Sequence, residues 1–192
     1  MGMIASLTTV SDANIRKLVQ DPLLVMLLAD RGDRKYYDMA REREQPGWFE
    51  RLRGKKAPLR LDPALFVVGP DEGEDVDLDK AWHGLHYLLT RTDWAGEPPL
   101  DFLVNRGAGI DDANRGFTAA EVVDIDAALG PIDAAWLRGR FDAAEMDRLE
   151  IYPLDWSEAD GGFEYVLEYF GNMREFIRRA AERRMGMIVS CG

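Results

Sequence analysis

The chain has 192 residues, of which 46% are apolar and 31% charged, and its formal net charge is −11. This length suits one substantial hydrophobic core, and the acidic balance opposes binding to nucleic acid or to an anionic membrane while favouring a basic partner protein. No apolar run approaches the roughly 20 residues that span a bilayer, no charged-then-apolar leader precedes the first predicted strand, and the single cysteine, Cys191, cannot form an internal disulfide, so we expect a cytoplasmic protein without a membrane partner.

The two ends of the chain are both predicted to be strands. Residues 3–10 mix β-branched and apolar side chains before a helix-capping signal at Ser11, which is typical of a strand that leads into a helix. Pro22 fits the first turn of a second helix, which Gly32 ends. Residues 187–191, reading MIVSC, are expected to join the first strand in a central sheet.

Residues 31–76 form a charged, insertion-like segment within the predicted domain. Its first part is a basic stretch, residues 31–60, in which Trp48 and Phe49 lie among the cations. A stretch of this kind either docks on an acidic surface or a nucleotide base, or is a solvated surface helix that its aromatic residues anchor, and the second reading is favoured because charge runs are usually solvated. The basic residues are Arg31, Arg34, Lys35, Arg41, Arg43, Arg51, Arg53, Lys55, Lys56 and Arg60.

The stretch DLDKAWHGLHYLLT, residues 77–90, is predicted to be the helix around which the fold is organised. Its leucines and Trp82 fall on one apolar face, and Asp77 is the expected N-cap. Asp79, His83 and His86 follow the border of that face, where side chains are half-buried. The two histidines stand at i, i+3 and not at the i, i+4 of a zinc-binding HExxH helix, so neither a metal site nor a cofactor is expected.

Three helices are predicted in the second half of the chain. Thr118 with Glu121, and Asp142 with Glu145, match the capping pattern at a helix N-terminus. The last helix, residues 163–184, has a continuous apolar side and basic residues toward its C-terminus. A short apolar run, LDFLV at residues 100–104, is read as a buried connection, and a short edge strand is read at residues 65–68.

The connector EIYPLDW, residues 150–156, is the second candidate stretch. Pro153 excludes a helix there, and the Tyr and Trp side chains are expected to pack their rings while their polar atoms face a partner. We therefore predict that this connector supplies the partner of His86. The candidate ligand-binding or partner-binding residues are Asp79, Trp82, His83, His86, Tyr87, Tyr152 and Trp156.

The central stretch resembles the D-K-x-W-x-x-L-H-[FY]-L-L-T motif of the YfbM-like family of bacterial proteins, a domain of unknown function. Further similar pieces are the opening MGMIAS, the segment TAAEV, and residues 137–153, which read LRGRFDAAEMDRLEIYP. Two segments differ: residues 31–60 look longer and more basic, and a Gly/Tyr-rich turn is reduced to residues 114–116. The resemblance implies an α/β fold, a single-domain three-layer α-β-α sandwich with a central mixed sheet, and no established activity.

Two classes of function follow from these patterns. The first is a small interaction protein, for instance of an immunity type, that meets a basic partner protein with its acidic surface. The alternative is a small-molecule-binding protein or an enzyme that uses a polar site around His86. No GxSxG elbow is present and Cys191 has no activating neighbour in the sequence, so the first class is favoured. The oligomeric state stays open.

Overall fold

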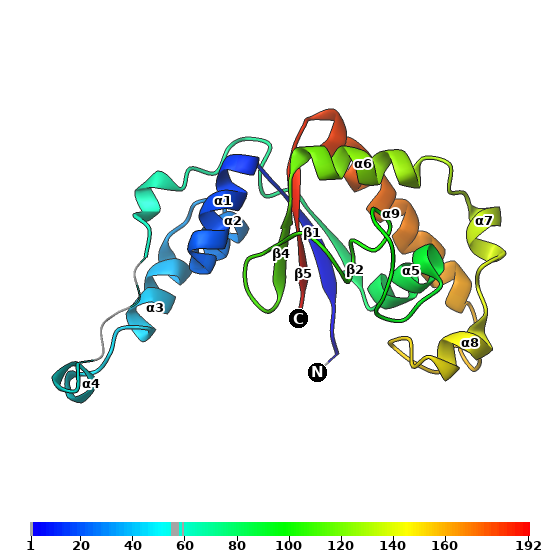
Figure 1. The fold of residues 1–192 in the computed structure, drawn as a ribbon, viewed down its shortest axis with the longest axis horizontal. Helices are drawn as coiled ribbons and strands as arrows, with labels where there is room; N and C mark the ends of the chain where they lie inside the picture. The colour runs from blue at the N-terminus through cyan, green and yellow to red at the C-terminus, as the bar shows by residue number, and fades with distance from the viewer. Residues whose placement is uncertain (1, 55–57, 59) are drawn as a thin grey trace.

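A five-stranded sheet lies at the centre of the fold, in a computed structural model that describes residues 2–54, 58 and 60–192 (Figure 1). The strand order is β2-β1-β5-β4-β3. Both chain ends lie in the middle of the sheet, where Ala5 pairs with Cys191 and Val10 with Gly186, so the predicted terminal strands are confirmed. The strands are β1 Ala5–Val10, β2 Asp75–Asp79, β3 Ala108–Gly109, β4 Asn114–Phe117 and β5 Gly186–Cys191.

The prediction of a mixed sheet is wrong, because every pair of neighbouring strands is antiparallel. A parallel pair needs a crossover that carries the chain back to the edge where the first strand began. Here β1 ends at Val10, and β2 begins at Asp75 opposite Thr8, near that same end. The helices between the two strands therefore bring the chain back to the end of the sheet at which β1 finishes, and β2 runs antiparallel to β1.

Helices lie on both sides of the sheet: α1 and α2 on one side, and α5, α6 and α9 on the other (Figure 1). Within the described residues, none of the helices is long and apolar enough to cross a membrane. The helices are α1 Asp12–Gln20, α2 Val25–Ala29, α3 Lys35–Arg43, α4 Trp48–Leu52, α5 Ala81–Thr90, α6 Ala119–Leu129, α7 Ala134–Arg138, α8 Ala143–Arg148 and α9 Gly162–Glu182, with short 3₁₀ turns at Pro22–Leu24 and Pro63–Leu65.

Side chains of β1 and β5 alternate between two apolar clusters. Leu7 and Val189 belong to the larger cluster, which also holds the buried faces of α5, α6 and α9. Val10 and Ile188 belong to the smaller cluster with residues of α1 and α2. Since successive side chains of a strand point to opposite faces, the two central strands hold both helical groups to the sheet.

The central helix is shorter and more deeply buried than predicted. It begins at Ala81, because residues 75–79 pair with β1 as strand β2 and satisfy their backbone groups there. Asp79 adopts φ 44°, which turns the chain from strand into helix. The predicted half-exposed border is also wrong: His83 and His86 are both 0% exposed, because the loop after α5 folds over them and accepts hydrogen bonds from both rings.

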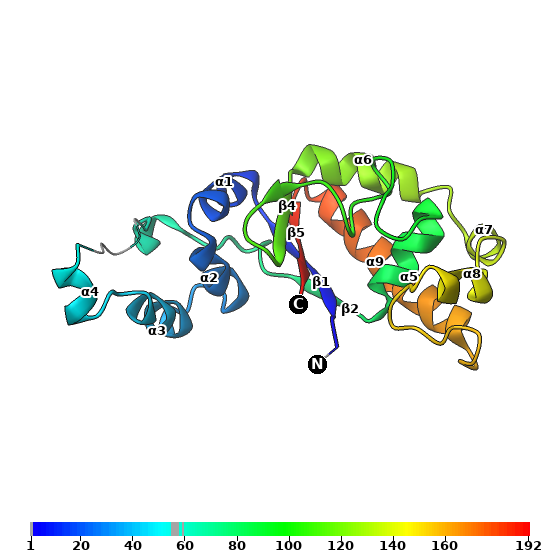
Figure 2. The same ribbon diagram turned by 60° about the horizontal axis from the view of Figure 1, so that its bottom comes forward.

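Helices α3 and α4 form an arm that extends from the body, with α4 as its tip (Figures 1 and 2). The base of the arm is packed: Tyr37 is buried, and Arg60 makes an ion pair with Asp21 at 2.7 Å. Lys55 and Lys56 of the predicted basic stretch lie outside the described residues. The edge strand predicted at residues 65–68 is absent from these described positions, where the 3₁₀ turn and irregular chain replace it.

Candidate functional site

His83 connects α5 to two different loops. Its Nε2 lies 2.9 Å from the Asp93 carbonyl oxygen, and its Nδ1 lies 3.0 Å from the Tyr152 backbone nitrogen. A backbone N–H can only donate, so Nδ1 accepts from Tyr152 and Nε2–H donates to Asp93. Burial lowers the pKa of His83 below its ordinary value, which keeps the ring neutral and preserves this pattern.

His86 bonds to the same loop but through one nitrogen. Its Nε2 lies 2.8 Å from the Ala95 carbonyl oxygen, while Nδ1 is buried with no hydrogen-bond partner among the described residues. Burial lowers the pKa of His86 to about 4. The expected partner from residues 150–156 is wrong, because that connector passes the first turn of α5 and bonds to His83 there.

The other predicted site residues also bond within the fold. Polar atoms of Asp79, Trp82, Tyr87 and Trp156 make hydrogen bonds to the protein, which indicates that these side chains support the fold around α5. The partners are the Tyr165 hydroxyl for Asp79, the Met3 carbonyl for Trp82, Glu145 for the Tyr87 hydroxyl, and the Ile151 carbonyl for Trp156. Tyr152 meets Trp82 through its ring, with the centroids 6.3 Å apart.

Gly84 allows the Trp156 ring to lie against α5. A Cβ at this position would come within 2.8 Å of that ring. Alanine raises helix propensity by about 1 kcal/mol, whereas overpacking of a core costs about 1–3 kcal/mol. We expect Gly84→Ala to lower the free energy of unfolding by about 1 kcal/mol in a urea titration.

Gly171 is the matched control for that substitution, because it also lies within a helix and, among the described residues, no atom beyond its own stretch of helix lies within 4 Å of an added Cβ. Gly171→Ala is expected to stabilise the protein by about 1 kcal/mol. If both substitutions stabilised the protein, the packing of Trp156 against α5 would not require glycine at position 84.

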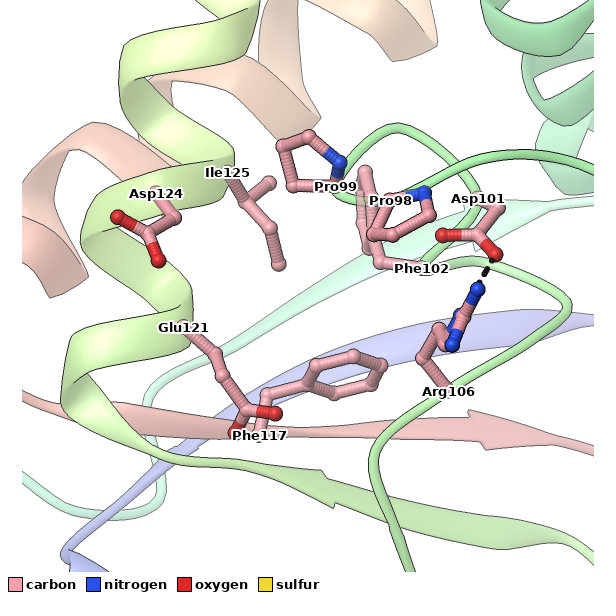
Figure 3. A pocket seen from close by; sticks show the side chains of 9 residues that line it. All are labelled: Pro98, Pro99, Asp101, Phe102, Arg106, Phe117, Glu121, Asp124 and Ile125. Atoms are coloured by element: carbon pink, nitrogen blue, oxygen red, sulfur yellow. Dashed lines mark hydrogen bonds and ion pairs between the residues drawn. The ribbon is translucent and has the colours of Figure 1, made fainter.

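A pocket of about 260 Å³ opens between α6 and the loop that follows α5 (Figure 3). Its floor and one wall are apolar, and three carboxylates and one guanidinium line the rest. A second hollow of about 470 Å³ adjoins it and shares Pro98 and Pro99. The first pocket is lined by Pro98, Pro99, Asp101, Phe102, Arg106, Phe117, Glu121, Asp124 and Ile125.

Asp101 is the buried charge of this pocket. Its side chain is 1% exposed, and one carboxylate oxygen accepts from the Arg106 Nε at 3.2 Å. The other oxygen, Oδ1, is buried without a hydrogen-bond partner among the described residues, and Figure 3 shows that it is turned away from Arg106. The Asp101 carbonyl accepts from the backbone of Val104 and Asn105, which fixes the turn. Because a buried carboxylate oxygen without a donor is costly, this atom is suited to a ligand that brings one.

Glu121 and Asp124 stand one turn apart on α6, and both are exposed at the pocket. With Asp101 they outnumber Arg106, so the charge of the pocket favours a cation. Within the described part of the chain, no group of three or more His, Cys, Asp or Glu side chains is placed to hold a metal ion. An organic cation suits the apolar floor better, since its stem can lie against Phe102 and Phe117.

Sequence reasoning missed this pocket. Asp101 lies in the apolar run at residues 100–104, whose pattern predicts only a buried connection, and the position of Glu121 predicts only a capping residue. The Glu121 carboxylate does accept from the Thr118 backbone N–H. An acidic residue inside a short apolar run was the available signal, because a buried carboxylate requires partners that the run itself does not supply.

Comparison with known proteins gives a family and a fold. The family model DUF1877, a domain of unknown function, matches residues 1–190. The crystal structure of YfbM from Escherichia coli, a protein of unknown function, is similar, with a TM-score of 0.63 and 17% identity over 98% of this chain and 99% of that chain. At this identity the similarity shows the fold alone. No curated protein matches.

Proposed function

The chain belongs to the DUF1877 family of domains of unknown function, and we propose that it is a binding protein for a basic group, a lysine or arginine side chain of a partner protein. The observation that carries the proposal is the Oδ1 atom of Asp101, which is buried, lacks a hydrogen-bond partner among the described residues and lines a pocket with two further carboxylates. The net charge of −11 supports the same class of partner.

The pocket matches such a side chain along its length. An ammonium or guanidinium group donates a charge-assisted hydrogen bond to Asp101, which is stronger than a bond between neutral groups. The methylene stem lies against Phe102, Phe117 and Ile125, so apolar area is buried together with the charge. Asp124, exposed at the pocket, draws the cation toward it.

The alternative, a small-molecule site or an enzyme around His86, has less support. The Nε2 of His86 is bonded to the Ala95 carbonyl, and the ring is fully buried behind the loop. A substrate would reach Nδ1 after that loop moved. The Asp101 carboxylate is also buried, but it lines a pocket that is already present in this structure, and we therefore base the proposal on it.

We also propose that the chain is one domain with three layers. The family match spans residues 1–190. The alternation of β1 and β5 side chains between two apolar clusters supports one shared sheet with a helical layer on each side.

Binding of a lysine peptide tests the proposed function. The probe is a blocked hexapeptide with three lysines, compared by calorimetry with the same peptide after lysine acetylation, which removes the charge. We expect Asp101→Asn to weaken binding of the first peptide by about tenfold, the loss of one charge-assisted hydrogen bond. The acetylated peptide should not bind.

The control variant is Asp112→Asn, which removes one exposed carboxylate from the β3–β4 loop, outside the residues that line the pocket. It should bind the lysine peptide as the parent does. Melting curves identify any variant that has lost its fold. Equal affinity of Asp101→Asn and the parent for the peptide would refute the proposal.

A further inference from the structure

The tip of the arm carries apolar side chains that the body leaves uncovered. Trp48, Phe49 and Leu52 of α4 are 67%, 73% and 68% exposed. The Trp48 and Phe49 rings meet edge to face with centroids 4.6 Å apart, so they form one surface. Large exposed apolar side chains that gather at one place are typical of an interaction site.

The arm also differs in charge from the rest of the chain. Residues 31–60 hold ten basic and five acidic side chains, a net charge of +5, and the remaining residues therefore carry −16 of the total of −11. Arg43 and Arg53 precede and follow the apolar tip in the sequence, and both are exposed. The arm is thus complementary in charge to the rest of its own chain.

The arm cannot reach the acidic pocket of its own copy in this structure. In Figures 1 and 2, α3 and α4 lie on one side of the sheet and α6 lies on the other. The packed base formed by Tyr37 and the Arg60–Asp21 ion pair fixes the direction of the arm. The arm of a second copy can approach the pocket from outside, because its direction is not fixed relative to this copy.

We propose that the arm docks on the acidic pocket of a second copy of this chain. Arg43 or Arg53 supplies the cation for Asp101, and Trp48 and Phe49 cover the apolar hollow beside Pro98 and Pro99. This inference rests on the proposed function, since it names the basic group that the pocket accepts. An anionic membrane is the less suitable occupant, because the body carries −16 and would be repelled from it.

Sedimentation velocity over a range of protein concentrations tests this docking. The parent is expected to associate, and added salt should weaken association because opposite charges meet at the contact. Trp48→Ser with Phe49→Ser, and separately Asp101→Asn, should each weaken association by about tenfold. Val19→Ser on α1, which changes an apolar residue that is also exposed, should leave association unchanged.

Mixing the two variants gives the sharpest result. The tip variant keeps an intact pocket and the Asp101→Asn variant keeps an intact arm, so the mixture should form a one-to-one complex more tightly than either variant associates with itself. If the Asp101→Asn variant associated as strongly as the parent, docking at the pocket would be overturned. If the parent bound the lysine peptide but stayed monomeric, the second copy would be overturned as the occupant and the proposed function would stand. The same conclusion would follow if the protein stayed monomeric and bound vesicles of anionic phospholipid through its tip.

Discussion

Replacement of His83 by alanine is expected to lower the free energy of unfolding by about 2–4 kcal/mol. The substitution removes both hydrogen bonds of the ring, so that the Tyr152 N–H and the Asp93 carbonyl lose their partner. It also leaves a cavity beside Trp82, because the His83 ring is wholly buried and stacks on that side chain. A urea titration followed by circular dichroism measures the change.

Trp94→Ala provides the control for that loss. The Trp94 ring contacts His83 with the centroids 4.4 Å apart, but it is 53% exposed. Its removal takes away the ring contact and leaves both hydrogen bonds of His83, so the cost should be below about 1 kcal/mol. Similar losses for the two variants would mean that ring contact, and not hydrogen bonding, makes His83 important.

The starts of α6 and α8 were predictable because their causes are local. The Thr118 side chain accepts from the Glu121 backbone N–H, and the Asp142 side chain accepts from the Glu145 backbone N–H, as the capping pattern indicated. Such bonds join residues three positions apart, and the sequence shows both partners. The terminal strands were predictable for a related reason, since their β-branched composition is itself a strand signal.

The environment of the central helix was not predictable from its own residues. Periodicity identified the apolar face of α5 but could not show that the loop after it covers the opposite side, where the Asp93 and Ala95 carbonyls accept from the two histidines. The start of the helix was misplaced for a similar reason. Residues 75–79 pair with β1, and that partner lies about 70 positions away in sequence.

The candidate pocket shows the same limit at the level of function. Asp101 comes from a loop and Asp124 from α6, and nothing in the spacing of the two residues indicates that they share a pocket. The family motif marks α5, whose polar side chains bond within the fold. The pocket is lined in part by the loop that follows that helix, so the motif indicates the neighbourhood of the candidate site and not its residues.

Acid should destabilise this protein through His86. The unfolded pKa of histidine is near 6.5, and burial lowers the folded pKa of His86 to about 4. Between these values the unfolded chain binds more protons than the folded one, so stability is complete above about pH 6.5 and falls as the pH falls toward 4. The shift corresponds to a loss of about 3 kcal/mol. His83 shifts in the same direction, whereas Asp93 and Asp101 oppose the shift of His86.

His86→Gln separates this effect from general acid denaturation. The glutamine amide can donate to the Ala95 carbonyl in place of the Nε2–H and does not titrate in this range. We expect the melting temperature of the parent to fall more steeply than that of the variant between pH 7 and pH 5, with a smaller slope left in the variant because His83 is still present. The Glu72 carboxyl, whose pKa is lowered by hydrogen bonds from Ser11, Gly69 and Asn14, titrates in a more acidic range and affects both proteins alike. Parallel melting curves across this range would show that the folded pKa of His86 lies near its unfolded value, and would refute the predicted effect.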